Sequence, residues 1–400
     1  MTTKGSTRLL RVVTSFVIAM GFAAVTLGAQ AQTSSLVYVE SNISTANGNS
    51  VFGFSNDGLG NLTALPGSPY LTGGTGVATD PAAFSVDGDA EVIANPEGTL
   101  LFAVNGNSNN VSVFDINSDG SLTPVTGSPF ASGGQEPISM AFDENGVSPN
   151  VSLMVVVNKA TDPNQSGGVP SYTTFKVSTA GKMVMNPGST WPLPVGSSPG
   201  QAIMQPNQRK FFGVEFLNNT LSSYRLTQLG IISQISQSTP PVNAPQTLGA
   251  VLHPTRSILY VGLPNQPAIA VYTYDAGGNL TYVQAAPNNG QAVCWLAVNT
   301  AGTRLYSAET DSGTITVYDL TTPKFPVRLQ HFSMSKTNGA PLPTNVALDP
   351  SQQFLYVVGR NAELHVLNIG SDGTLSETIS PTTLPVPPQT VPLGLAVLTK

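Results

Sequence analysis

A unit of four short apolar runs recurs along the chain, and this repetition restricts the possible folds more than any other feature. The first run of each copy is rich in β-branched and aromatic residues, and seven copies align on one central residue. The central residues are Tyr38, Phe102, Val155, Phe212, Tyr260, Tyr306 and Tyr356, spaced 46 to 64 residues apart. Self-similarity at such a period indicates a repeat architecture.

The remaining runs of each copy predict what the repeating unit is. The second run alternates apolar and polar residues, as in residues 111–116 (VSVFDI), which is typical of a half-buried strand. Turn signals such as Asp119-Gly120 and Asp372-Gly373 follow, before a weaker third run. A fourth run without alternation, such as residues 293–298 (VCWLAV), precedes most first runs and indicates a strand buried on both faces. Four strands in each of seven copies predict an all-β, seven-bladed β-propeller with four-stranded antiparallel blades.

The order of the runs also predicts how the ring closes. The first copy begins with a first-run segment at Leu36 (LVYVE), and the chain ends with a segment of the innermost type at Gly394 (GLAVLTK). We therefore expect the C-terminal strand to complete the N-terminal blade. A tandem array of β-sandwiches is the alternative, but it does not explain why the strand missing from the first copy is found at the end.

The first 31 residues have the pattern of a secretory signal peptide. Three basic residues precede an uncharged apolar stretch over residues 12–29, and Ala29-Gln30-Ala31 offers a cleavage site between small residues. A membrane anchor is the alternative, because about 18 apolar residues just suffice to span a bilayer. We expect a signal peptide at 1–31, a propeller at 32–400, export to the periplasm or beyond, and no membrane span once the leader is removed.

Composition excludes several classes of function. Only 10 % of the residues are charged and the formal net charge is −6, so a nucleic-acid partner is not expected. A single cysteine excludes a disulfide framework and cysteine-based zinc sites. No two of the three histidines have metal-ligand spacing, so we expect neither a metal nor a cofactor. The protein is expected to be a monomer.

The repeated elements resemble those of a known propeller group. The elements LYV, VxVF or VxVY and DG recur, the innermost strands end in Asp, His or Asn before Pro, and GSP with an aromatic residue appears at residues 67–70 and 127–130. Together they are similar to YVTN-type propellers and to the lactonase family related to 6-phosphogluconolactonase, over residues 36–400. The resemblance implies a seven-bladed fold.

For the hydrolytic relatives, the resemblance implies a site at one mouth of the central channel. It implies His and Arg near the entry of inner strands and acidic residues at the ends of the following strands. Here the fourth inner strand and its approach contain no His, and the fifth has His253 only at its far end. Glu215 stands where the relatives carry an acid, so it is the one weak catalytic candidate that the resemblance provides.

The ends of the seven first runs are predicted to share one mouth of the channel. With their neighbours they offer carboxylates, amides and a guanidinium, which suit a sugar, another small polar molecule or a hard cation. A solvated funnel without a ligand is the alternative. The candidate binding residues are Glu40, Asn105, Asn158, Glu215, Glu309, Asp311 and Arg360, with Trp295 as a ring on which a sugar would stack.

Three further motifs have a structural interpretation. Asp115 begins DINSDG, but the twelfth position of this calcium-loop pattern is Thr126 instead of Glu, which favours a hairpin turn. Ser198 lies in GSSPG, but Pro199 and the following strand leave no helix for a nucleophile elbow. Cys294 has no base or cation nearby in the sequence, which favours a buried, inert thiol.

Two classes of function remain open. The absent His and Arg set favours a non-catalytic module that binds a small polar molecule or a protein partner at the channel mouth. The family resemblance favours a lactone, that is carboxylic ester, hydrolase acting on an unphosphorylated sugar lactone or a similar substrate.

Overall fold

The computed structural model describes most of the chain, and contacts between residues divide it into two units, Met1–Gln32 and Thr33–Lys400. The described residues are 1–3, 5, 34–78, 85–162, 165, 167–205, 208–240 and 246–400. The predicted signal peptide lies almost wholly outside the described residues and stays a prediction. In the part of the chain that is described, no helix has the length and hydropathy needed to cross a bilayer.

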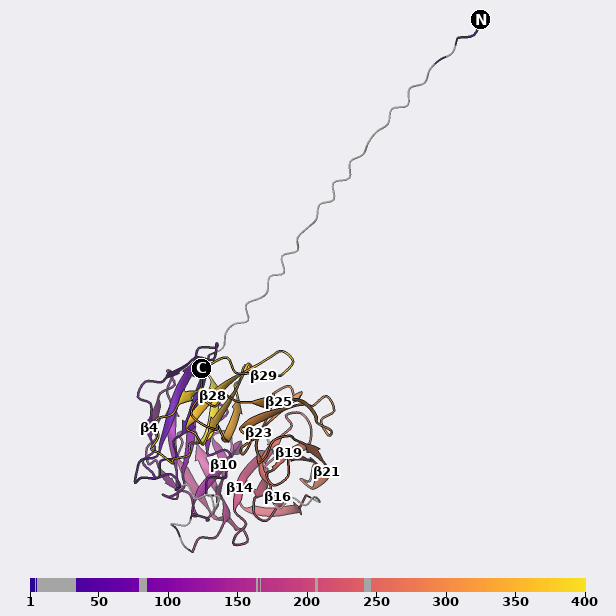
Figure 1. The fold of residues 1–400 in the computed structure, drawn as a ribbon. Helices are drawn as coiled ribbons and strands as arrows, with labels where there is room; N and C mark the ends of the chain where they lie inside the picture. Colours follow the sequence, from indigo (N-terminus) through magenta and orange to yellow (C-terminus); the bar gives the residue numbers. More distant parts are fainter. Residues whose placement is uncertain are drawn as a thin grey trace. The chain divides into compact units, whose positions relative to one another are not determined.

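The second unit consists of seven antiparallel sheets, each forming one blade of a propeller (Figure 1). The inner strands are β31 (Leu393–Thr399), β5 (Val92–Ala94), β10 (Pro137–Ser148), β14 (Pro199–Gln205), β18 (Leu248–Leu252), β22 (Val293–Val298) and β26 (Pro343–Leu348). In this order they belong to blades 1 to 7. Each inner strand contacts the inner strands of both neighbouring blades, and β26 contacts β31, so the ring is closed.

The outer parts of the blades follow in the same order. The second strands are β1 (Ser35–Glu40), β6 (Leu100–Asn105), β11 (Val151–Asn158), β15 (Lys210–Glu215), β19 (Ile258–Leu263), β23 (Arg304–Glu309) and β27 (Phe354–Gly359). The third strands are β2 (Ser50–Asn56), β7 (Asn110–Ile116), β12 (Ser171–Ser178), β16 (Thr220–Leu226), β20 (Ala268–Tyr274), β24 (Thr314–Asp319) and β28 (Glu363–Ile369). The outermost segments are β3 (Leu62–Ala64), β4 (Tyr70–Leu71), β8 (Leu122–Pro124), β9 (Phe130–Ala131), β13 (Met183–Pro192), β17 (Ile232–Ser238), β21 (Leu280–Pro287), β25 (Val327–Ser333), β29 (Leu375–Ser376) and β30 (Thr382–Thr383).

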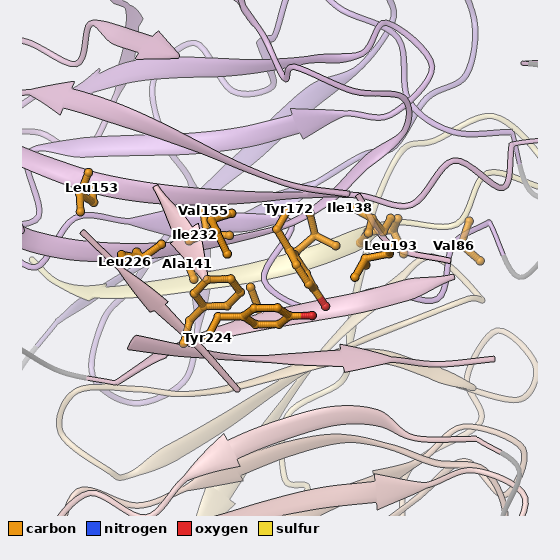
Figure 2. Packing of buried hydrophobic residues seen from close by; sticks show 14 of the residues in the cluster. Val86, Ile138, Ala141, Leu153, Val155, Tyr172, Leu193, Tyr224, Leu226 and Ile232 are labelled. Carbon is orange, nitrogen blue, oxygen red and sulfur yellow. The ribbon is translucent and has the colours of Figure 1, made fainter. Parts of the chain in front are cut away.

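The predicted fold class is confirmed, and burial explains the run patterns. Second strands such as β6 (LLFAVN) are buried along their whole length because neighbouring blades cover both faces. The outermost strands, which correspond to the third runs of the sequence pattern, are partly exposed. This exposure explains why the third runs are the least apolar in the sequence. Figure 2 shows the core between blades 3 and 4, where Tyr172 meets Tyr224 edge-on with ring centroids 5.2 Å apart.

Closure by the C-terminal strand is also confirmed. β31 pairs antiparallel with β1, from Ser35 opposite Thr399 to Glu40 opposite Leu393. Blade 1 therefore has the order β3-β2-β1-β31, with β4 pairing beside β3 on β2. The two ends of the propeller unit thus lie in one sheet.

A register shift recurs near the start of six inner strands, for example between Val293 and Trp295. Such a bulge leaves one residue unpaired and increases the local twist. In β18 the extra residue is Gly249, with φ of 60°. A Cβ atom there would lie 1.7 Å from the carbonyl oxygen of Cys294 in the next blade, so only glycine allows this close approach. Neighbouring blades are therefore in close contact where their inner strands begin.

The inner strand of blade 2 was not assigned from the sequence, because β5 has only three residues and a long connection precedes it. Residues 85–91 of this connection, here called the channel loop, contact blades other than their own. The Asp89 amide donates to the carbonyl of Gly200 in blade 4. The Asp89 carboxylate accepts from Gln201 of blade 4 and from Asn345 of blade 7, both at 3.0 Å. The loop therefore lies across the channel where the inner strands begin.

Candidate functional site at the channel mouth

All seven second strands end at the face where the inner strands begin, which we call the entry mouth. The register shows this directly, since Glu215 pairs with Pro199, Glu309 with Val293 and Gly359 with Pro343. The candidate residues at these strand ends therefore belong to one face of the propeller. Their side chains, however, do not all turn toward the channel.

The three predicted glutamates, Glu40, Glu215 and Glu309, are buried inside the blades. Glu40 accepts a hydrogen bond from the Asn49 side chain at 2.7 Å, and the same amide donates to Asn105 at 2.9 Å. The structure thus joins two of the candidates, Glu40 and Asn105, through Asn49 and not through a shared cavity. Asn158 has a comparable place within blade 3, where its amide donates to the carbonyl of Ser132 at 3.4 Å.

Glu215 and Glu309 are likewise held by residues of their own blades. Glu215 accepts from Ser222 at 2.7 Å and from Tyr224 at 3.1 Å. Glu309 accepts from Ser307, Asn288 and Thr314, and its side chain is fully buried. These carboxylates support the blade structure, and their predicted role in ligand binding stays a prediction.

Burial shifts the titration of these carboxyl groups strongly. Desolvation raises the pKa of Glu40 to about 8, although the hydrogen bond from Asn49 acts against it. Desolvation likewise raises the pKa of Glu309 to about 7, against four side-chain hydrogen bonds. Both groups hold a proton more tightly in the folded protein than in the unfolded chain.

We therefore expect the free energy of unfolding to fall as the pH rises from about 5 to about 8. Below the usual glutamate pKa both states are protonated, whereas between that value and the folded pKa only the unfolded chain releases its protons. Each unit of pKa difference changes the stability by about 1.4 kcal/mol, so the fall amounts to several kcal/mol. Urea unfolding at pH 5, 6, 7 and 8 measures it.

The double variant Glu40→Gln/Glu309→Gln tests the origin of this slope. Glutamine resembles the protonated acid, so the variant should have a clearly smaller pH dependence and be more stable than the native protein at pH 8. Glu97→Gln, at an exposed glutamate, is the matched control and should keep the slope. An unchanged slope in the double variant would show that these two groups are not its cause.

A pocket of about 200 Å³ opens at the entry mouth, between the channel loop and blades 4 to 7. It is lined by Val86, Asp87, Phe216, Gln246, Leu248, Pro264, Asn265, Ala292, Cys294, Thr310, Asp311 and Arg360. The lining includes the apolar side chains Phe216 and Leu248, here called the apolar wall, and the charged groups Asp87, Asp311 and Arg360, here called the charged wall. Two predicted binding residues, Asp311 and Arg360, are thus brought together in one cavity.

The charged wall is built on Asp87. Its carboxylate pairs with the Arg360 guanidinium at 3.1 Å, and the two side chains are 13 % and 29 % exposed. Beneath it, the fully buried Lys159 donates from Nζ to the Asp87 carbonyl oxygen. Burial raises the pKa of the Asp87 carboxyl, while the charges of Lys159 and Arg360 oppose the change. The channel loop is therefore fixed by two cations from blades 3 and 7.

Of the other residues considered in the sequence analysis, only Cys294 lines this pocket, and its thiol is unreactive there. Trp295 is buried, and its indole N–H donates to the Pro343 carbonyl at 2.8 Å, so it packs between blades 6 and 7. Cys294 contributes to the pocket wall, but desolvation and the negative charge of Asp87 raise the pKa of its thiol. Asp115 lies in β7 directly before a hairpin turn, and Ser198 directly precedes β14.

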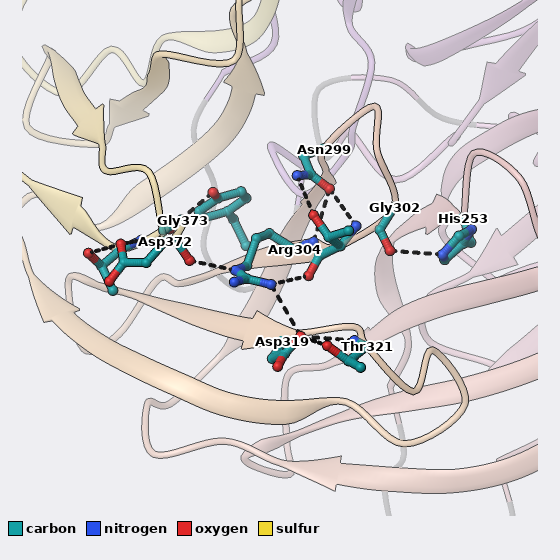
Figure 3. Close-up of polar contacts among 11 residues, drawn as sticks. His253, Asn299, Gly302, Arg304, Asp319, Thr321, Asp372 and Gly373 are labelled. Atoms are coloured by element: carbon teal, nitrogen blue, oxygen red, sulfur yellow. Dashed lines mark hydrogen bonds and ion pairs between the residues drawn. The ribbon is translucent and has the colours of Figure 1, made fainter. Parts of the chain in front are cut away.

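The histidines and the acidic groups of the described residues form no second centre of this kind. None of the three histidines lines the pocket; His253, for example, contacts the carbonyl of Gly302 at 3.0 Å (Figure 3). No three His, Cys, Asp or Glu side chains among the described residues are grouped to hold a metal ion.

Asp87 and Phe216 were not predicted as pocket residues. The signal for Asp87 was the acidic run Asp87-Gly88-Asp89-Ala90-Glu91 in a chain with only 10 % charged residues. Such a run directly before an innermost strand indicates a loop that reaches the channel. Phe216 stands one position beyond the end of its strand, and no sequence signal distinguished it from the buried aromatic residues of the blades.

Comparison with known proteins supports the propeller assignment. Residues 168–324 match the family model described as lactonase, 7-bladed β-propeller. The fold superposes on a candidate 6-phosphogluconolactonase from Bacteroides fragilis with a TM-score of 0.69 and 14 % identity, covering 92 % of this chain and 98 % of that one. The periplasmic gluconolactonase of Pseudomonas aeruginosa gives 0.66 and 14 %, covering 92 % and 99 %. A Lactobacillus plantarum protein gives 0.68 and 16 %, again covering 92 % and 99 %.

These matches confirm the resemblance that the repeats indicated, in sequence over residues 168–324 and in fold over the propeller. No curated protein matches the sequence significantly. The matched residues include Phe216, Cys294 and Asp311 of the pocket, whereas Asp87 and Arg360 lie outside them.

Proposed function

We propose that the protein binds one small hydroxylated molecule, of the size of a sugar ring or its lactone, in the pocket at the entry mouth. The observation that carries this proposal is the pairing of Asp87 with Arg360 in a cavity that the apolar side chains of Phe216 and Leu248 also line. Carboxylates accept hydrogen bonds from hydroxyl groups and a guanidinium donates them, while a sugar ring also presents an apolar C–H face. The leader pattern supports the further proposal that this binding takes place outside the cytoplasm.

The size of the cavity limits the ligand. A volume of about 200 Å³ corresponds to roughly seven water molecules in the liquid. Pockets for small-molecule ligands usually measure about 300–1,000 Å³, so this cavity is smaller than most. One ring with its substituents therefore suits the pocket better than an oligosaccharide.

Hydrolysis of an unphosphorylated lactone is the second candidate function, favoured by the lactonase family match. Water would attack the lactone carbonyl, the ring C–O bond would break, and a hydroxy acid would leave. Asp311 is the carboxylate placed to take the proton from water, and Arg360 is placed to stabilise the oxyanion. Binding without turnover remains the first proposal, because no histidine among the described residues lines the pocket.

Arg360→Gln tests the site. Titration calorimetry with D-glucose and D-glucono-1,5-lactone should show that this variant binds at least about tenfold more weakly, because a charge-assisted hydrogen bond is lost. Arg304→Gln is the matched control, since Arg304 pairs with Asp319 at 3.2 Å at the opposite end of β23 (Figure 3). Equal affinities in both variants, or no binding by the native protein, would overturn the proposal.

The same lactone distinguishes the two functions. Acid release followed at constant pH should equal the spontaneous rate if the protein only binds. A rate above it that is lost in Asp311→Asn, with binding retained, would establish the hydrolase instead.

A further inference from the structure

We propose that the pocket selects a cationic hydroxylated ligand, such as an amine-bearing sugar, over phosphorylated or carboxylated ones. Asp311 recognises the positive charge, and Asp87 offsets the positive charge of Arg360. The proposal rests on the proposed function, because it names the ligand class of the same pocket. It is argued from the charges that line the cavity.

The positive groups near the pocket are already engaged. Arg360 is the one Lys or Arg among the described lining residues, and its guanidinium is held by Asp87 at 3.1 Å. Lys159 lies underneath, with no exposed surface, between the Asp87 carbonyl and the ring of Phe216, whose centroid is 5.9 Å from Nζ. Asp87 offsets the charge of Arg360, so a phosphate or carboxylate entering the pocket would have to compete with this carboxylate, and Lys159 is out of its reach.

The negative groups are in excess. Asp311 lies at the exposed rim and makes no ion pair with any described residue. Two carboxylates and one guanidinium therefore line the cavity. Behind them Asp89 is ionised at neutral pH, because burial raises its pKa only to about 6, and it opposes the positive charge of the buried Lys159. A cleft with a net negative charge raises the local concentration of cations.

The geometry assigns a role to each wall. The amine of the ligand lies at Asp311 on the rim, its hydroxyl groups face the Asp87–Arg360 pair, and its ring covers Phe216 and Leu248. An anionic substituent meets the Asp311 carboxylate, the apolar surface of Phe216 and Leu248, or a guanidinium whose charge Asp87 already offsets. The selectivity is therefore built into the residues and does not depend on which sugar enters.

A cysteine thiol placed in the pocket measures the electrostatic potential of the pocket without any ligand. We would replace the single cysteine by Cys294→Ser and introduce Asn265→Cys at an exposed lining position. The rate of thiol modification is measured with two methanethiosulfonates, the cationic trimethylammonium-ethyl reagent and the anionic sulfonatoethyl reagent. The ratio of the cationic to the anionic rate is then divided by the same ratio for 2-mercaptoethanol. The normalised ratio should exceed tenfold, and adding Asp311→Asn should lower it at least threefold.

Thr281→Cys in the same Cys294→Ser background is the control thiol, on the exposed outer strand β21 of blade 5, and should give a ratio near that of 2-mercaptoethanol. Adding Asp87→Asn, which frees Arg360, should bring the pocket ratio to one or below. A pocket ratio of one or less in the presence of both aspartates would overturn the proposal. Because Asp311 is exposed, its variant keeps the test valid if Asp87→Asn fails to fold.

Calorimetry with glucosamine, glucose and glucose 6-phosphate then links the potential to binding. The three probes share one ring and differ in charge, and the native protein should bind them with affinity falling in that order, by about tenfold at each step. Asp311→Asn should remove the preference for glucosamine. Equal affinities would overturn the charge selection and leave the proposed function standing. No binding of any probe, together with a high thiol ratio, would support the charge selection and overturn the proposed sugar ligand.

Discussion

Deletion of residues 391–400 is expected to abolish cooperative unfolding. The deletion removes β31, so blade 1 loses its inner strand and the ring loses its closure. Leu393, Leu395 and Ala396 are buried, and burial of each large side chain contributes about 1.5–3 kcal/mol. With the lost ladder, the cost is comparable to the whole stability of a domain, which is about 5–15 kcal/mol. A calorimetric melt of the truncated protein should show no sharp transition.

Two controls accompany the deletion. Removal of Lys400 alone takes away an exposed residue beyond β31 and should leave the melting temperature unchanged. A synthetic peptide of residues 391–400, added in excess to the truncated protein, should restore the transition by supplying the missing strand. A truncated protein that melts as sharply as the native one, at the same temperature, would mean that the propeller does not need the closing strand β31 for cooperative unfolding.

Replacement of His365 by leucine is expected to lower the free energy of unfolding by about 3–5 kcal/mol. The imidazole lies buried between two carboxylates, with Nδ1 at 2.6 Å from Glu377 and Nε2 at 3.7 Å from Glu363. Glu377 also accepts from the backbone amide of Ser335, which precedes blade 7 in the chain. Without the imidazole, two buried carboxylates face an apolar side chain. Urea unfolding at pH 7 measures the loss.

His331→Leu is the matched control, because His331 lies exposed on β25, where its ring contacts the hydroxyl group of Thr316 at 2.9 Å. Its effect should stay within about 0.5 kcal/mol. Adding Glu363→Gln and Glu377→Gln to His365→Leu should recover part of the loss, since the unpaired charges are then gone. A loss below 1 kcal/mol for His365→Leu would contradict the buried-pair account.

The same cluster contributes a pH dependence of the opposite sign to that of Glu40 and Glu309. Burial acts to raise the pKa of Glu377, but hydrogen bonds from His365 and Ser335 outweigh it and hold the pKa below its usual value. This contribution is therefore present above the usual glutamate range and is lost as the pH falls through the folded pKa.

Much of the fold could be predicted from the sequence because each blade repeats one pattern. The aligned centres from Tyr38 to Tyr356 all lie in second strands, and the segment at Gly394 lies in the closing strand. The exception is β5, whose three residues are too few to carry a period and whose neighbour, the channel loop, occurs once. Comparison of the repeats shows only features that the copies share, so it does not detect a loop that occurs in one copy.

The candidate site could be predicted only in part, for a related reason. Side chains alternate along a strand, and in a blade covered on both faces neither direction points into the channel. Glu40 and Glu309 at the strand ends therefore turn into the blades. Asp311 and Arg360 stand one or two positions beyond their strands, where the backbone turns, and they reach the pocket. Their partner Asp87 comes from the channel loop, which the repeat pattern does not describe.

The closing strand has a consequence for how the protein is made. Six blades consist of consecutive strands, but blade 1 joins β1 to β31, which is translated after all the other strands. While β31 is still inside the ribosome, the nascent chain cannot complete blade 1. Final assembly of the propeller therefore waits until β31 has left the ribosome.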